Sequence, residues 1–233
     1  MNKQLIKVLE ELNKITDSVI LKYPITTAIS EAADIRVILD VSKIEDKPFP
    51  EIGLSKNLSN YLSLYKLFGE DREVTYEGDV IKISSGDITS SYITDSTVLM
   101  DSYNIDIDQF SKTEAVPSVV EFDLLVEDIK KINSASSVFK DLNEVIIASI
   151  DGDVSVYLGA TGKFNARNNN FKINKRVKST KDFEVKIPVE NFKRIPESEF
   201  KVSLKYNSAK DSYRVLLSSN TLEGFKIILS TKI

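Results

Sequence analysis

Two stretches of the chain place apolar residues at helical spacing. Between residues 4 and 15 they recur every three or four positions, at Leu5, Val8, Leu9, Leu12 and Ile15. Such a period gathers the apolar side chains on one face of a helix. A second stretch of this kind, residues 58–68, ends at Gly69, and glycine commonly follows the last turn of a helix. Two amphipathic helices are therefore predicted in the first half of the chain.

Short segments rich in β-branched and aromatic residues lie around these helices, and such segments are typical of strands. Proline and glycine separate them, as at Pro24 and Gly78. The predicted strands of the first half are residues 18–23, 25–30, 35–41, 73–76, 80–84 and 88–94.

Residues 101–118 have little periodicity and contain Pro117, so they are interpreted as a connector between two halves. The boundary is placed near residue 112, which gives domains of residues 1–112 and 113–233. After it we predict helices at 126–139 and 189–195, and strands at 119–124, 144–150, 154–158, 171–177, 183–187, 200–206, 213–218 and 225–229.

The second half contains an internal repeat. Residues 121–132 (EFDLLVEDIKKI) and 184–195 (EVKIPVENFKRI) align without a gap. In each, an alternating strand leads through a turn into a helix that begins with Val-Glu. Two adjacent basic residues then stand between two apolar ones. With a weaker echo at residues 52–61, the pattern indicates a unit of strand, helix and strands repeated about four times.

The composition is that of an ordinary globular protein, with 42% hydrophobic and 28% charged residues. Cysteine and histidine are both absent, which removes thiolate metal sites and every histidine-based catalytic triad. We therefore predict no enzyme activity, no catalytic residue, no metal site and no cofactor. The start of the chain does not have the pattern of a signal peptide, and no stretch is apolar for the roughly 20 residues of a membrane span, so a soluble protein is expected.

Four short helices among many strands, two per half, resemble the sliding-clamp fold of proliferating cell nuclear antigen and the clamps of T-even-like bacteriophages. The resemblance covers nearly the whole chain and implies an α+β class. Each of the two domains would hold two repeats, with helices on one face of antiparallel sheets. The length favours the phage type, whose two-domain subunits form a trimeric ring, and with it the cytoplasm of an infected bacterial host. The sequence departs from the phage pattern in an acidic segment, residues 104–108, and in a polar loop, residues 161–170.

In that family the helices line a central hole through which duplex DNA passes. The net charge of −4 argues against DNA as a partner only on average, because the basic residues here concentrate on the predicted helices. The residues expected to face DNA are Lys3, Lys7, Lys14, Lys56, Lys66, Lys130, Lys131, Lys193 and Arg194. The resemblance implies a DNA polymerase processivity factor, with the polymerase and a clamp-loader ATPase as further partners and no membrane.

Clamps also bind the peptide tails of their partners in an apolar pocket near the connector. The candidates in this chain are Ile105, Ile107, Phe110 and Val116, which are apolar side chains in a polar segment. They could equally pin the connector onto the sheets.

Two other functions stay open at this stage. One is a monomeric processivity factor of the herpesvirus type, which has the same fold and binds DNA directly. The other is a virion structural protein of mixed β architecture that has no role in DNA binding.

Overall fold

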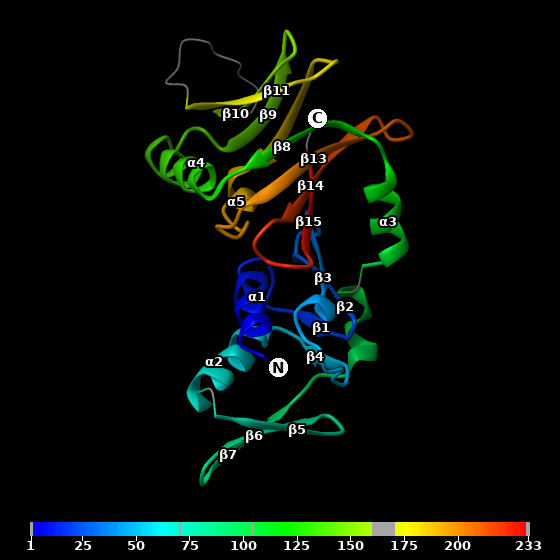
Figure 1. Ribbon diagram of the computed structural model, residues 1–233, viewed down its shortest axis with the longest axis vertical. Coiled ribbons are helices and arrows are strands. Elements are labelled where there is room, and N and C mark those ends of the chain that lie inside the picture. Colours follow the sequence, from blue (N-terminus) through cyan, green and yellow to red (C-terminus); the bar gives the residue numbers. More distant parts are fainter. Residues whose placement is uncertain (1, 70, 104, 160–170, 232–233) are drawn as a thin grey trace. The chain divides into compact units, whose positions relative to one another are not determined.

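The computed structural model describes residues 2–69, 71–103, 105–159 and 171–231 (Figure 1). The predicted loop at residues 161–170 lies outside them, as does Asn104. The chain divides into two compact units, which we call unit 1 (residues 1–107 and 222–225) and unit 2 (residues 108–221 and 226–233). Within each unit the paired strands are antiparallel, and the predicted α+β class is confirmed.

Unit 1 combines two helices with two groups of strands. The strands run in the orders β4-β1-β2-β3 and β5-β6-β7. Its elements are α1 (Lys3–Asn13), β1 (Val19–Leu21), β2 (Ile25–Ile29), β3 (Ile35–Asp40), β4 (Ile52–Leu54), α2 (Leu58–Phe68), β5 (Glu73–Glu77), β6 (Val80–Ser85) and β7 (Ile88–Ile93), with 3₁₀ turns η1 (Val41–Lys43) and η2 (Thr97–Tyr103).

Unit 2 has the orders β8-β13-β14-β15 and β11-β10-β9-β12. Its elements are α3 (Ile107–Ala115), β8 (Ser118–Leu124), α4 (Val126–Val138), β9 (Glu144–Ile150), β10 (Asp153–Gly159), β11 (Lys172–Lys178), β12 (Phe183–Pro188), α5 (Val189–Phe192), β13 (Phe200–Asn207), β14 (Ser212–Ser219) and β15 (Phe225–Ser230). Both α3 and β15 begin with one residue that belongs to unit 1.

The apolar stripes seen in the sequence form the core of each unit. In unit 1, Leu9 and Leu12 of α1 are fully buried, and so are Tyr61 and Tyr65 of α2. The two tyrosine rings lie 4.9 Å apart and their hydroxyls are 3.1 Å apart. Burial raises the pKa of Tyr61 well above its ordinary value, so its hydroxyl stays protonated.

Three elements differ from the sequence prediction. The connector holds a 9-residue helix, α3, where an irregular segment was expected. The sequence did not indicate this helix, because only Phe110 and Thr113 are buried and two residues are too few to show a helical period. The strand β4 was not predicted, and α5 ends at Phe192, so Lys193 and Arg194 lie after the helix and not on it.

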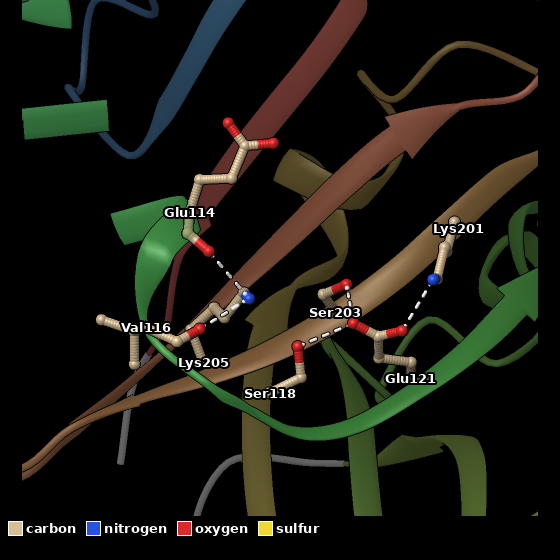
Figure 2. A network of polar contacts seen from close by, with 7 residues as sticks. All are labelled: Glu114, Val116, Ser118, Glu121, Lys201, Ser203 and Lys205. Atoms are coloured by element: carbon tan, nitrogen blue, oxygen red, sulfur yellow. Dashed lines mark hydrogen bonds and ion pairs between the residues drawn. The ribbon is translucent and has the colours of Figure 1, made fainter. Parts of the chain in front are cut away.

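A polar network on β8 and β13 strengthens their pairing (Figure 2). The Glu121 carboxylate accepts hydrogen bonds from Ser118 Oγ at 2.8 Å and Ser203 Oγ at 3.2 Å, and it pairs with Lys201 Nζ at 2.7 Å. Lys201 first, and then the serines, lower the pKa of Glu121 to about 2. The group therefore contributes stability that is present above its unfolded pKa of about 4.3 and is lost as pH falls through about 2.

We predict that the Glu121 carboxyl carbon titrates near pH 2 in a pH series followed by NMR. Lys201→Met should move this pKa upward, toward the ordinary value, because the main hydrogen-bond donor is lost. Lys181→Met, which removes an exposed lysine outside the network, should leave it unchanged. A Glu121 pKa near 4 in the parent protein would contradict the geometry of the network.

Candidate nucleic-acid interface

The basic residues of α1 lie on the side of the helix opposite its buried stripe. Asn2 caps this helix by accepting a hydrogen bond from the Leu5 N–H at 2.8 Å. With the apolar residues buried, Lys3, Lys7 and Lys14 are all exposed. Lys14 pairs with Glu11 at 2.6 Å, so this face carries both signs of charge.

The α2 helix packs against α1 and adds further cations. Lys66 pairs with Glu10 of α1 at 2.9 Å, and these side chains are 64% and 35% exposed. Lys56 precedes the helix in a left-handed conformation with φ of 55°, and its N–H donates to Ser18 Oγ at 2.9 Å. Its side chain is exposed, as predicted. The helix surface of unit 1 is therefore basic, with Glu10 and Glu11 reducing its charge.

In unit 2 the repeat gives two pairs of cations the same setting. Lys130 and Lys131 of α4 are exposed between Ile129 and Ile132, which are 0% and 1% exposed. After α5, Lys193 is exposed and Arg194 half-buried.

The flanking residues of this second pair, Phe192 and Ile195, are 3% and 2% exposed. Both helices, α4 and α5, pack on the sheet that contains β9. The Lys130 ammonium lies 3.9 Å from the carboxylate of Glu197, which follows the second cation pair closely in the sequence. The two pairs of cations thus belong to neighbouring elements of one unit.

A buried ion pair fixes the start of α4. The Asp128 carboxylate accepts a hydrogen bond from the Leu125 N–H at 3.1 Å and pairs with Lys175 of β11. The two side chains are only 11% and 10% exposed. Lys175 also donates to the Asp123 carbonyl at 2.8 Å and lies 5.6 Å from the centre of the Phe122 ring. These contacts hold the first turn of α4, the helix that carries Lys130 and Lys131.

The four residues predicted to form a partner-peptide pocket have different surroundings. Ile105 is half-buried in unit 1, where its N–H donates to Thr27 Oγ1 at 3.1 Å. Ile107 and Phe110 both belong to α3, where Ile107 is 42% exposed and Phe110 is buried. Val116 is half-buried and lines a groove beside α3. No shared pocket lined by all four is seen among the described residues, and the partner-peptide pocket stays a prediction.

Two sets of cations were missed in the sequence. Strand β11 carries Lys172, Arg176 and Lys178 on its exposed positions, and the alternation of basic and other residues in KINKRVK signalled this. A second set surrounds the groove beside α3, and its members come from segments about 100 residues apart, so no sequence pattern signals it.

The described residues contain no group of three or more acidic residues arranged to hold a metal ion. In the same part of the chain, every helix is too short or too polar to cross a membrane.

Comparison with known proteins gives the fold but no relative by sequence. Neither the protein-family models nor the curated proteins match this sequence. Among solved structures, PCNA of A. fulgidus bound to the C-terminal region of FEN-1 matches with a TM-score of 0.68 at 12% identity, over 100% of this chain and 97% of that one. PCNA of Entamoeba histolytica matches with a TM-score of 0.64 at 12% identity, over 99% and 95%.

A bacterial DNA polymerase sliding clamp, from Pseudomonas aeruginosa, matches with a TM-score of 0.63 at 11% identity. The match covers 99% of this chain and 62% of that clamp. At these identities the comparison establishes the fold alone. The chain has the sliding-clamp fold across both units, and the resemblance inferred from its repeat is confirmed.

The buried pair gives a test of how α4 is held. Lys175→Met leaves the Asp128 charge without its cation, and we expect the free energy of unfolding to fall by about 3 kcal/mol in urea denaturation. Adding Asp128→Asn removes that charge while keeping an oxygen for the Leu125 N–H, so the double variant should regain part of the loss. Lys178→Met, from a pair that is 72% exposed on both sides, should have little effect. Additive single effects would contradict this coupling.

Proposed function

We propose that this protein is a sliding clamp, a ring-shaped DNA polymerase processivity factor that encircles duplex DNA and tethers the replicative polymerase. Its two clamp domains would be residues 1–112 and 113–233, and three subunits would close the ring. A clamp-loader ATPase would place it on DNA, in the cytoplasm of an infected bacterium if the source is a phage. In this function the protein itself catalyses no reaction.

The observation that carries this proposal is the repeated setting of the cation pairs in a chain with the clamp fold. Lys130–Lys131 lie on α4 and Lys193–Arg194 directly after α5, and each pair stands between two buried apolar residues. Three of these four cations are exposed and Arg194 is half-buried. One such pair on a helix is an ordinary solvated surface. Two at equivalent positions, on neighbouring elements, support a shared anionic partner.

The mixed charge of the helix surfaces is suited to sliding. Lysine contacts to phosphate oxygens are independent of sequence and weaken with salt. Glu10 and Glu11 pair with Lys66 and Lys14 and so lower the attraction per helix. A ring that holds DNA by its topology needs only weak contacts, because strong contacts at one register would oppose movement.

Two edge strands are the best candidates for closing the ring. In unit 1, β7 lies at one edge of the β5-β6-β7 group and exposes Ile88 and Ile93, at 67% and 75%. In unit 2, β11 lies at the edge of its sheet and carries the basic residues described above. Pairing β7 of one subunit with β11 of the next would satisfy both edges, which otherwise invite aggregation.

Like charges placed on β7 test this interface. Ile88→Lys combined with Ile93→Lys should set new cations against basic β11, and we expect the subunit dissociation constant to rise at least about tenfold in light scattering. The matched control is Val98→Lys with Leu99→Lys, two apolar residues of η2 that are 83% and 85% exposed. Equal effects of the two pairs would exclude β7 from the interface.

The function itself is tested on DNA. The parent should be a trimer at micromolar concentration and should lengthen the products of its cognate polymerase on a primed circular template. Lys130→Gln, Lys131→Gln and Lys193→Gln together should shorten those products, because phosphate contacts are lost. Neutralising Lys43, Lys47 and Lys181 removes the same charge elsewhere and should not. A monomer that binds short linear duplexes would favour the herpesvirus type, and a lack of stimulation would refute the proposal.

A further inference from the structure

A basic groove lies in unit 2 between α3 and the turn that joins β13 to β14. Its volume is about 430 Å³, within the range of ligand-binding pockets. Four cationic side chains line it, and no carboxylate does. They come from three elements and the turn, namely Lys112 of α3, Lys205 of β13, Lys210 of the turn and Arg214 of β14.

Lys205 is the buried cation of this groove. This residue is only 8% exposed. Its ammonium donates to the carbonyl oxygens of Val116 at 2.7 Å and Glu114 at 3.1 Å, where α3 ends (Figure 2). The Glu114 carboxylate points away from it and pairs instead with Lys226 at 2.5 Å. Among the described residues Lys205 has no carboxylate partner, although buried charges are normally paired.

The other cations surround this buried charge. Arg214 is half-buried and donates to Thr113 Oγ1 at 2.9 Å, which holds it against α3. Lys112 and Lys210 are exposed at the rim and form no ion pair with the residues described. One carboxylate lies at this turn, that of Asp211, which accepts a hydrogen bond from the Tyr206 hydroxyl at 2.7 Å and is not among the residues that line the groove. An anion entering the groove would therefore meet a net positive field.

The remaining lining residues indicate what kind of anion fits. Gln109 and Asn207 supply amide groups that can bond to a peptide backbone, and Val116 and Tyr206 supply apolar surface for a side chain. Single-stranded nucleic acid is usually held by several stacking aromatics, whereas Tyr206 is the sole aromatic residue among those lining this groove. We propose that the groove binds a short acidic peptide segment of a partner protein.

This inference rests on the proposed function only for the identity of the partner, since a polymerase or loader subunit would carry the segment. It also differs from the predicted apolar pocket, because carboxylates and not apolar side chains supply the main contacts. Binding should therefore weaken as salt increases.

The test uses fluorescein-labelled hexaglutamate on the full-length protein, with hexaglutamine and oligothymidine of similar length as comparison probes. Hexaglutamate should bind by fluorescence anisotropy, and its NMR footprint should include Val116, Tyr206 and Asn207. Lys112→Gln with Lys210→Gln should weaken binding about tenfold, because two exposed cations of the rim are lost. Lys47→Gln with Lys181→Gln removes the same charge away from the groove and should change it less than about twofold.

Three results would overturn the inference. They are equal effects of the two double variants, a footprint elsewhere, or oligothymidine binding at the groove in preference to hexaglutamate. Light scattering of the Lys112→Gln, Lys210→Gln variant separates this question from the clamp proposal. If it remains the same oligomer as the parent and loses the peptide, the groove alone is affected. If the parent is monomeric, the clamp proposal fails while peptide binding at the groove is still measured.

Discussion

The candidate DNA surface depends on one packing constraint. Apolar residues on each side of a cation pair are buried in the core, so the cations between them lie at the surface. Ile129 and Ile132 are inside unit 2, so the helix between them must turn Lys130 and Lys131 outward. Exposing either isoleucine would cost about 2 to 3 kcal/mol, far more than one solvated lysine contributes by any surface contact. The position of the charges is therefore set by packing and not by attraction to a partner.

The Asp128–Lys175 pair adds a second constraint to the same surface. Apolar burial alone would let α4 rotate slightly or fray at its first turn. One carboxylate that both caps the helix and pairs with β11 ties the start of α4 to an edge strand. Because β11 is also the candidate subunit edge, the ion pair links the helix that carries the candidate DNA-facing residues to the proposed interface within unit 2.

Cations in this protein have three different roles that net charge cannot distinguish. Lys130 and Lys131 are exposed on a helix, Lys175 is buried in an ion pair, and Lys205 is buried against the carbonyl oxygens at the end of α3. The first role needs only an exposed position. The other two need a partner in space, and in both cases it lies far away in sequence. An overall charge of −4 is compatible with all three.

The sequence by itself determined four of the five α-helices in the described residues, most strands and the repeat, because these depend on local period. The apolar residues from Leu5 to Ile15, for example, lie on one face of a helix by their spacing alone. The sequence also determined which lysines would be exposed, since Lys130 and Lys193 stand between residues that must be buried. The helix α3 was not predicted from the sequence, because its two buried residues, Phe110 and Thr113, are too few to show a helical period. Only the tertiary structure brought Lys112 beside Lys205 and Arg214, since contacts between residues about 100 positions apart leave no periodic trace in the sequence.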